Sequence, residues 1–149
     1  MTRYGKAFNE LSIGDKIEEG ITVTEAHLTN AAALFNDYNA LHTNEPAMRR
    51  SRFGARIAHG ALTFGLMVGV YSKYFRDTDI STVEASIKFT APIYIGDTIR
   101  MSWEVVGLDP KPKLNGGLVT LSGRATNQKD TLVAETAAKL LVSNKTIFE

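Results

Sequence analysis

The chain has 149 residues, 44% hydrophobic and 22% charged, a composition typical of a folded globular protein. Its 17 basic and 16 acidic residues give a formal net charge of +1, which argues against binding nucleic acid or an anionic membrane through an overall field. The absence of cysteine excludes disulfides, thiol nucleophiles and thiolate metal sites.

Length and hydrophobic pattern predict one domain, residues 1–149, located in the cytoplasm. A chain of this size can bury a substantial core without metal ions or disulfides. The N-terminal stretch MTRYGKAFNELSIGD lacks the apolar segment of a signal peptide. The longest apolar run, residues 61–70, is too short to span a bilayer, so no membrane association is expected.

The first predicted elements are a short strand, residues 21–23, and a helix, residues 24–35, with the sequence TEAHLTNAAALF. Thr24 suits the N-cap position, and the Ala- and Leu-rich sequence after it favours a helix. The loop FNDYNALH, residues 35–42, lies at the C-terminal end of this helix.

A second helix is predicted to begin at Ala58 or His59 and to continue through GALTFGLMVGVYSKYF. It is apolar on nearly every side, as expected for a central helix wrapped by other elements. Its glycines lower helix propensity and indicate that a neighbouring backbone comes close along one side; they are Gly60, Gly65 and Gly69.

The rest of the chain has the two-residue period of β-strands. Alternation predicts half-buried strands at residues 82–89 and 99–105, and two more follow at residues 118–126 and 132–142. The loop DPKPKLNGG separates the two pairs, and the turn-forming cluster NQKD joins the last two strands. The sequence therefore predicts an α+β fold, with a helix on one face of an antiparallel meander.

The loop after the first helix contains the first candidate for chemistry. It places Asp37, Asn39 and His42 within six residues, and loops held by rigid elements often carry catalytic groups. The spacing alone is weak evidence, because an acidic residue five places before a histidine is common. The alternative is that Asp37 and Asn39 form an Asx-type turn and that His42 packs beside Leu41.

The start of the central helix, Ala58-His59-Gly60, is the second candidate. Free backbone N–H groups there can polarise a carbonyl oxygen, and Gly60 would let a ligand approach the main chain. The alternative is an ordinary helix start with His59 as a partly buried residue. His59 is improbable as a metal ligand, because no HxH or HExxH spacing accompanies it, and no metal site is predicted.

Four arginines precede this helix start in the segment MRRSRFGARIAHG. They suit phosphate binding, although a solvated surface is the more common meaning of such a cluster. They are Arg49, Arg50, Arg52 and Arg56. The sequence has no glycine-rich phosphate loop, GxSxG elbow or dinucleotide fingerprint, and no cofactor is expected.

Taken together, FNDYNALHTNE and RFGARIAHGALT resemble the signature of the MaoC-like family of (R)-specific enoyl-CoA hydratases. The family loop typically reads G-D-x-N-P-L-H, and its central helix begins H-G. The order of elements is also similar to the family's hotdog fold, an antiparallel sheet wrapped around a long apolar helix, over nearly the whole chain.

The resemblance implies hydration of a trans-2-enoyl thioester to the (R)-3-hydroxyacyl thioester, or the reverse dehydration, as in fatty-acid metabolism. It implies that Asp37 and His42 are the catalytic acid/base pair, that Asn39 lies near them, and that the Gly60 N–H contacts the thioester carbonyl. The implied partner is an acyl-CoA or acyl-carrier-protein thioester, which is the substrate rather than a cofactor. The resemblance also implies a homodimer or dimer-based oligomer.

Three positions depart from the family pattern. Asn36 replaces a glycine, a mild change if the position is left-handed. Ala40 replaces a proline, which could loosen the loop. Met48 stands at a usually small position and could narrow the pocket.

Two other functions are compatible with a hotdog fold. A hotdog thioesterase, like the dehydratases of fatty-acid synthesis, typically has an acidic residue on the central helix, and ALTFGLMVGVYSKYF contains none. A non-catalytic acyl-CoA-binding protein with the same fold is the alternative from another class. Acyl chain length, the identity of the carrier and the physiological direction stay open.

Overall fold

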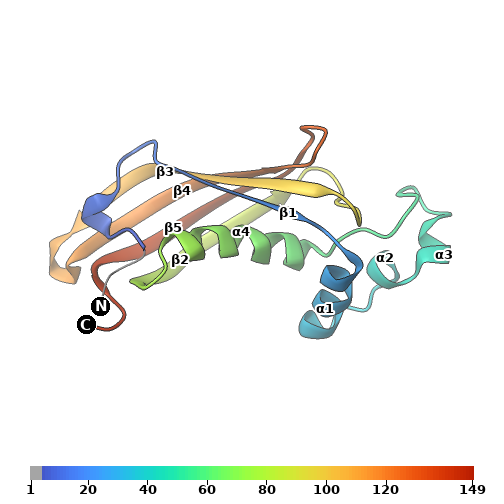
Figure 1. The fold of residues 1–149 in the computed structure, drawn as a ribbon, viewed down its shortest axis with the longest axis horizontal. Helices are drawn as coiled ribbons and strands as arrows, with labels where there is room; N and C mark the ends of the chain where they lie inside the picture. The colour runs from blue at the N-terminus through green and yellow to red at the C-terminus, as the bar shows by residue number, and fades with distance from the viewer. Residues whose placement is uncertain (1–4) are drawn as a thin grey trace.

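A computed structural model describes residues 5–149 and shows a curved sheet with one long helix along its inner face (Figure 1). The helices are α1 (Glu25–Phe35), α2 (Ala40–Thr43), α3 (Glu45–Met48) and α4 (Gly60–Tyr74), with 3-10 turns η1 (Phe8–Glu10) and η2 (Pro112–Leu114). The strands are β1 (Lys16–Thr22), β2 (Thr78–Phe89), β3 (Thr98–Lys111), β4 (Gly116–Thr126) and β5 (Leu132–Thr146). The predicted α+β class is confirmed. Residues 1–4, part of the stretch considered for a signal peptide, lie outside this description.

The five strands form one antiparallel sheet in the order β1-β3-β4-β5-β2. Strands β3, β4 and β5 are neighbours both in sequence and in the sheet, as a meander requires. Strand β2 precedes β3 in the chain but lies at the far edge, beside β5, where Ile87 is opposite Thr136. The prediction of a four-strand meander is therefore wrong for its first strand, because the chain crosses the whole sheet between β2 and β3.

Two connections in the sheet follow from local sequence. The hairpin between β4 and β5 is confirmed, and the Asp130 N–H donates to the Asn127 carbonyl over 3.0 Å. Strand β3 continues to Lys111, so the first three residues of the predicted loop 109–117 belong to the strand. Pro110 is tolerated there because β1 pairs with β3 only as far as Glu104, which leaves that side of the strand without a partner.

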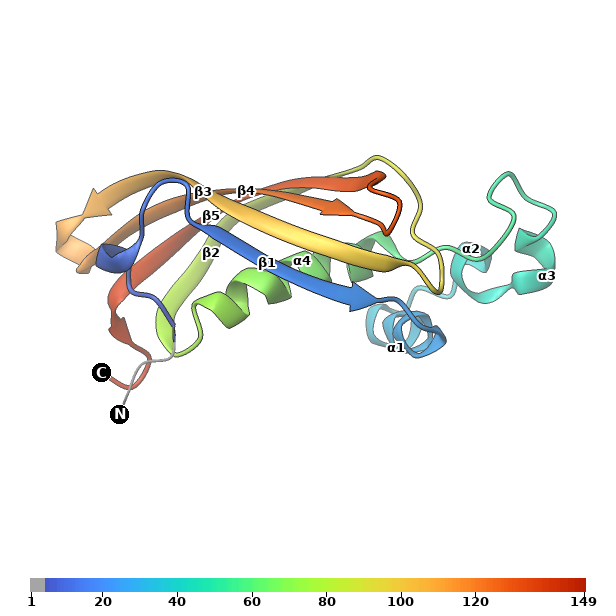
Figure 2. The same cartoon turned by 45° about the horizontal axis from the view of Figure 1, so that its top comes forward.

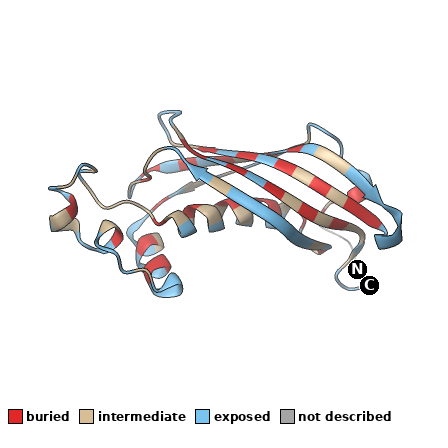
Figure 3. Cartoon of the chain, turned by 180° about the vertical axis from the view of Figure 1, so that it is seen from behind, coloured by how far each residue is buried: buried red, intermediate tan, exposed pale blue. Residues whose placement is uncertain are grey.

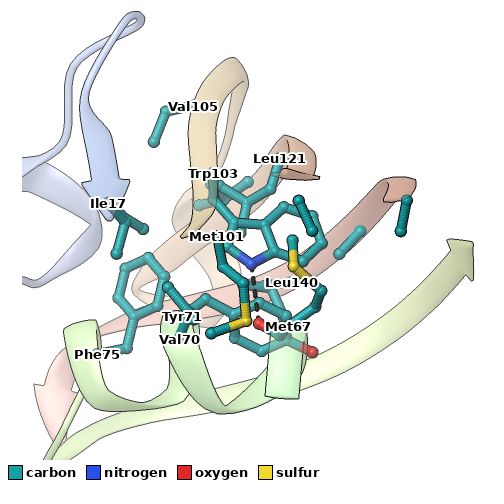
Figure 4. Packing of buried hydrophobic residues seen from close by; sticks show 14 of the residues in the cluster. Ile17, Met67, Val70, Tyr71, Phe75, Met101, Trp103, Val105, Leu121 and Leu140 are labelled. Carbon is teal, nitrogen blue, oxygen red and sulfur yellow. Dashed lines mark hydrogen bonds between the residues drawn. The ribbon is translucent and has the colours of Figure 1, made fainter. Parts of the chain in front are cut away.

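The core lies between α4 and the inner face of the sheet (Figure 4). Met67, Val70 and Tyr71 are the buried residues of α4 in this layer. The indole N–H of Trp103, on β3, donates to the Met67 carbonyl over 2.8 Å, so the largest core side chain also fixes the position of the helix. Gly123 is opposite Trp103 on β4, and a Cβ there would lie 2.6 Å from the indole ring.

Helix α4 is buried on one side only. Gly65 and Gly69 are exposed, and a Cβ at either would meet no atom within 4 Å. At Gly60 a Cβ would meet the ring of Phe89 rather than backbone. The prediction of a close neighbouring backbone is therefore wrong within this chain, and the sheet covers the helix without enclosing it. No helix among residues 5–149 has the length and apolarity needed to cross a membrane.

Edge strand β2 is more exposed than its alternating pattern predicts. Val83 is 59% exposed and Phe89 53% exposed, whereas the same alternation in β3 buries Met101, Trp103 and Val105. Figure 3 shows this contrast as alternating buried and exposed positions in the central strands. A register irregularity between Thr82 and Glu84 accompanies the exposed stretch. The apolar face of β2 is thus open in the single chain.

Helices α1, α2 and α3 lie beyond the N-terminal end of α4 (Figure 2). Helix α1 begins where the sequence predicts, with Thr24 as the N-cap, and the Thr24 backbone N–H donates to His27 Nδ1 over 2.9 Å. The loop that leaves α1 therefore meets the start of α4, which brings together the two motifs singled out in the sequence.

Candidate active site

The loop after α1 is held in a defined conformation. Asn36 is the C-cap of α1 and has left-handed backbone angles, φ 52° and ψ 37°, and the Asp37 N–H donates to the Ala32 carbonyl over 3.1 Å. Asparagine tolerates this region better than most non-glycine residues, so the replacement of the family glycine leaves the turn intact.

Asp37 and Asn39 form the Asx-type turn that was the alternative interpretation. The Asn39 N–H donates to Asp37 Oδ1 over 3.2 Å, and Asn39 Oδ1 accepts from the Leu41 N–H over 3.0 Å, which caps α2. The turn uses only the Oδ1 oxygen of Asp37. The other oxygen, Oδ2, lies 3.6 Å from His42 Nε2. The Asx turn is therefore present, and it leaves the second carboxylate oxygen directed toward the histidine.

His42 has a defined tautomer in its neutral form. Its Nδ1 lies 2.7 Å from the Ile57 carbonyl oxygen, and since a carbonyl can only accept, Nδ1 carries the hydrogen. The other nitrogen, Nε2, then has a free lone pair and faces Asp37. The side chain is 8% exposed, whereas that of Asp37 is 45% exposed. A base with one free nitrogen beside a carboxylate can take a proton from a water molecule.

Gly60 is the first residue of α4, where the backbone N–H has no acceptor inside the helix. A cavity of about 620 Å³ opens beside it. The wall of this cavity includes His42 and Gly60, and most of the remaining lining residues are apolar: Leu41, Phe53, Ile57, Ala58, Phe89, Ala91, Pro92, Ile93 and Val133. Asp37 and Asn39 are not part of this wall. The cavity therefore exposes one base and one helix N-terminus to the same apolar space.

The arginines have separate positions. Arg52 is exposed, contributes to the cavity wall and stacks on the Phe53 ring at 4.5 Å. Arg49, 74% exposed, pairs with Glu45 over 3.3 Å, and Arg50 is exposed. Arg52 is thus the member of the cluster placed to meet a ligand that leaves the cavity.

Arg56 forms ion pairs with two carboxylates, those of Glu25 and Glu45. Its Nη1 lies 2.9 Å from Glu25 Oε1, and its Nε lies 3.0 Å from Glu45 Oε2. The hydrogen bonds that Arg56 donates lower the pKa of both glutamates, and the same bonds raise the pKa of the arginine. Only 17% of the Arg56 side chain is exposed, and it does not belong to the cavity wall, so it is less accessible to a ligand than Arg52.

Met48, expected to narrow the pocket, is 4% exposed and does not belong to the cavity wall. Phe53 and Phe89 do line the cavity, although no sequence motif selects them. Phe89 lies at the end of edge strand β2, and a ring carbon of Phe89 would be 2.9 Å from a Cβ at position 60. A substitution pattern among relatives, rather than periodicity, would be the signal for such a residue.

His59 is more involved in the site than its sequence context indicated. Its ring stacks on that of His42, with centroids 3.7 Å apart and planes at 24°, and its Nε2 lies 3.0 Å from the Asp37 carbonyl oxygen. Asp37, His42 and His59 place ligand atoms within 4.8 Å of one another, a spacing compatible with a metal ion. Imidazole lone pairs lie in the ring plane, however, and the lone pairs of two stacked rings do not converge on one ion. The geometry favours a hydrogen-bonded cluster.

Comparison with solved structures defines the class of fold. R-hydratase PhaJ1 from Pseudomonas aeruginosa, unliganded, superposes with a TM-score of 0.85 at 24% identity, covering 95% of this chain and 88% of that chain. The (R)-hydratase from Aeromonas caviae involved in PHA biosynthesis superposes with a TM-score of 0.78 at 25% identity, covering 87% of this chain and 96% of that chain. The predicted hotdog fold is confirmed.

Sequence comparison then identifies the family. The profile described as a MaoC like domain matches residues 9–127. The (R)-specific enoyl-CoA hydratase of Rhodospirillum rubrum is 32% identical over 127 residues, which cover 80% of this chain and 88% of that protein. The chain belongs to the MaoC-like dehydratase family. Its relatives are lyases, which confirms the prediction of an enzyme of that class.

Proposed function

We propose that this protein hydrates trans-2-enoyl thioesters to (R)-3-hydroxyacyl thioesters, and catalyses the reverse dehydration, with Asp37 and His42 as its acid/base pair. The observation that carries the proposal is the free Nε2 of His42, 3.6 Å from the Asp37 carboxylate, in the wall of an apolar cavity that also contains Gly60. Relatives named as an (R)-specific enoyl-CoA hydratase and a 3-hydroxybutyryl-CoA dehydratase support the reaction class.

The reaction adds one water molecule across the C2–C3 double bond. His42 Nε2 removes a proton from a water molecule that Asp37 helps to hold, and the hydroxyl oxygen bonds to C3. The electron pair of the double bond moves toward the thioester carbonyl, so that an enolate forms. The proton taken up by His42 is then delivered to C2, which restores the free base.

The negative charge that develops on the thioester oxygen needs a fixed donor. The Gly60 N–H at the start of α4 supplies one, and the positive end of the helix dipole adds to it. Such a donor contributes more where fewer water molecules compete for the oxygen, and most of the side chains around Gly60 in the cavity wall are apolar. Asn39, through its hydrogen bond to Asp37, keeps the carboxylate directed at His42.

The proposed substrate carries coenzyme A or acyl carrier protein. Relatives named as acting on either carrier are similar to this chain. Arg52, exposed at the cavity wall, is the arginine proposed to contact a phosphate of the carrier. Arg49 and Arg50 precede it in the same segment and are also exposed. No cofactor is required by the proposed steps.

The protein is further proposed to act as a homodimer. Edge strand β2 exposes Val83 and Phe89, and the open side of α4 exposes Gly65 and Gly69. A second copy would cover an unpaired strand edge and an apolar helix face. Light scattering at working concentration would measure the mass directly.

The test of activity is the ultraviolet absorbance of a short trans-2-enoyl-CoA incubated with the full chain, followed by chiral analysis of the product. Loss of absorbance with formation of the (R)-3-hydroxy product, abolished in Asp37→Asn and His42→Ala, would support the proposal. Asp109→Asn is a matched control, because it removes the charge of a paired carboxylate on β3 that is not part of the cavity wall. Tight binding of enoyl-CoA without turnover would favour a non-catalytic binding protein instead.

Hydrolysis of the thioester would indicate a thioesterase, and release of free coenzyme A measures it. The structure gives no support for thioesterase activity, because α4 contains no acidic residue that could serve as the catalytic carboxylate typical of hotdog thioesterases.

A further inference from the structure

His59 contacts both members of the proposed acid/base pair. Its Nε2 lies 3.0 Å from the Asp37 backbone carbonyl oxygen, and since a carbonyl only accepts, Nε2 is the donor. Its ring lies against that of His42, with centroids 3.7 Å apart. One imidazole thus fixes the backbone that carries the carboxylate and the plane of the ring that carries the base.

The other ring nitrogen indicates that packing alone does not account for a histidine here. The side chain is 1% exposed, and Nδ1 is the one buried side-chain nitrogen or oxygen among residues 5–149 without a hydrogen-bond partner. A buried acceptor without a partner destabilises the folded protein, and an apolar side chain of similar size would avoid that cost. The Nε2 hydrogen bond and the stacked ring are the contacts that need an imidazole.

His59 is itself held by the helix that carries the proposed oxyanion donor. It is the N-cap of α4, and its carbonyl oxygen accepts from the Thr63 N–H over 3.1 Å and from Thr63 Oγ1 over 3.2 Å. Gly60 is the next residue. His59 therefore links the start of α4 to Asp37 and His42 through contacts that are all short.

We infer that His59 is a positioning residue, whose Nε2 hydrogen bond to the Asp37 carbonyl sets the placement of Asp37 relative to His42 and the Gly60 N–H. The inference rests on the proposed hydration activity. His59 is not part of the cavity wall and so acts through its neighbours rather than on the substrate. Displacement of a catalytic group by about 1 Å can lower a rate by about a hundredfold, so the effect of losing this link is measurable.

Two amide substitutions separate the hydrogen bond from the volume of the side chain. In His59→Gln the amide nitrogen is as many bonds from Cα as Nε2 of histidine, so it can donate to the Asp37 carbonyl. In His59→Asn the amide nitrogen corresponds to Nδ1, the position without a partner. Both variants lose the stacked ring, which makes them matched. kcat and KM are measured for a short trans-2-enoyl-CoA, and melting temperature serves as the folding control.

The expected result is a kcat at least about tenfold lower for His59→Asn than for His59→Gln, with KM changed by less than about twofold. Equal kcat values in the two variants, high or low, would overturn the inference and leave His59 a packing residue. If neither amide variant folds, His59→Phe decides, because it keeps a ring against His42 without the donor. A folded Phe variant with the kcat of the unmodified protein would also overturn it, and a tenfold loss would support it. An inactive unmodified protein would instead overturn the proposed function.

Discussion

Arg56 donates to both carboxylate oxygens of Glu25, with Nη1 2.9 Å from Oε1. This contact joins the start of α1 to the segment that leads into α4. The same guanidinium holds Glu45 at the start of α3. Three segments around the candidate active site are therefore fixed by one side chain.

We expect Arg56→Met to lower the melting temperature at neutral pH by a few degrees, because Glu25 loses its ion pair and Glu45 keeps only the exposed Arg49. The contribution depends on pH in a defined direction. The folded-state pKa of Glu25 and of Glu45 is lowered from the ordinary value of 4.5, so both groups stabilise the fold fully above that value. Their contribution is lost as the pH falls through the lowered values.

The difference in melting temperature between the unmodified protein and Arg56→Met should consequently shrink as the pH is reduced below about 4.5. Arg49→Met is the control, because Arg49 is 74% exposed and makes a single pair with Glu45. A difference that stays constant from pH 7 to pH 3 would contradict the ion-pair interpretation.

The contact between Gly60 and Phe89 predicts a specific double-variant result. A Cβ at position 60 would lie 2.9 Å from the far end of the Phe89 ring, which must then move within the cavity. We expect Gly60→Ala to fold normally and to lower kcat/KM by roughly tenfold. Phe89→Leu should restore most of this loss when the two changes are combined. Measurements on both single variants and the double variant give the coupling, and strictly additive effects would contradict the contact.

The parts of this fold that depend on local sequence could be predicted. The Thr24 N-cap and the Ala-rich sequence after it predicted α1, and the long apolar stretch predicted α4. Turn-forming residues predicted the hairpin at residues 127–130. The position of β2 could not be predicted in this way, because alternation marks a strand but not the neighbour with which it pairs. The same limit explains why Val83 and Phe89 were expected on a half-buried face.

In the candidate site too, contacts between residues close in sequence could be predicted, whereas contacts between distant residues could not. Asp37, Asn39 and His42 are close in sequence, and the Asx turn that orients them follows from their spacing. The contact between His59 and Asp37 joins residues 22 positions apart, and its geometry depends on how α1 lies against α4. The Arg56–Glu25 pair spans 31 positions, so the sequence did not indicate this contact.

Position 40 offers a stabilising substitution. Ala40 is the first residue of α2, where proline is well tolerated, and the preceding Asn39 has φ −53° and ψ 140°, which suit a residue before proline. We expect Ala40→Pro to raise stability by about 0.4–1 kcal/mol through loss of unfolded-state entropy, with hydratase activity maintained. Ala40→Gly should have the opposite effect on stability. Chemical denaturation of the three proteins provides the comparison, and destabilisation by proline would show that the loop needs freedom at this position.

The proposed homodimer predicts that charge on edge strand β2 will separate the subunits. Val83 is 59% exposed near the middle of β2, whose outer edge has no partner in the described sheet. A carboxylate there would have to be buried or opposed by its copy in an edge-to-edge dimer, so Val83→Asp should shift the mass from dimer toward monomer. Val106→Asp is the control, because Val106 is 47% exposed but lies on β3, inside the sheet order. Light scattering across a concentration series measures both variants. An unchanged dimer in Val83→Asp would place the interface away from this edge, and a monomeric unmodified protein would remove the dimer proposal.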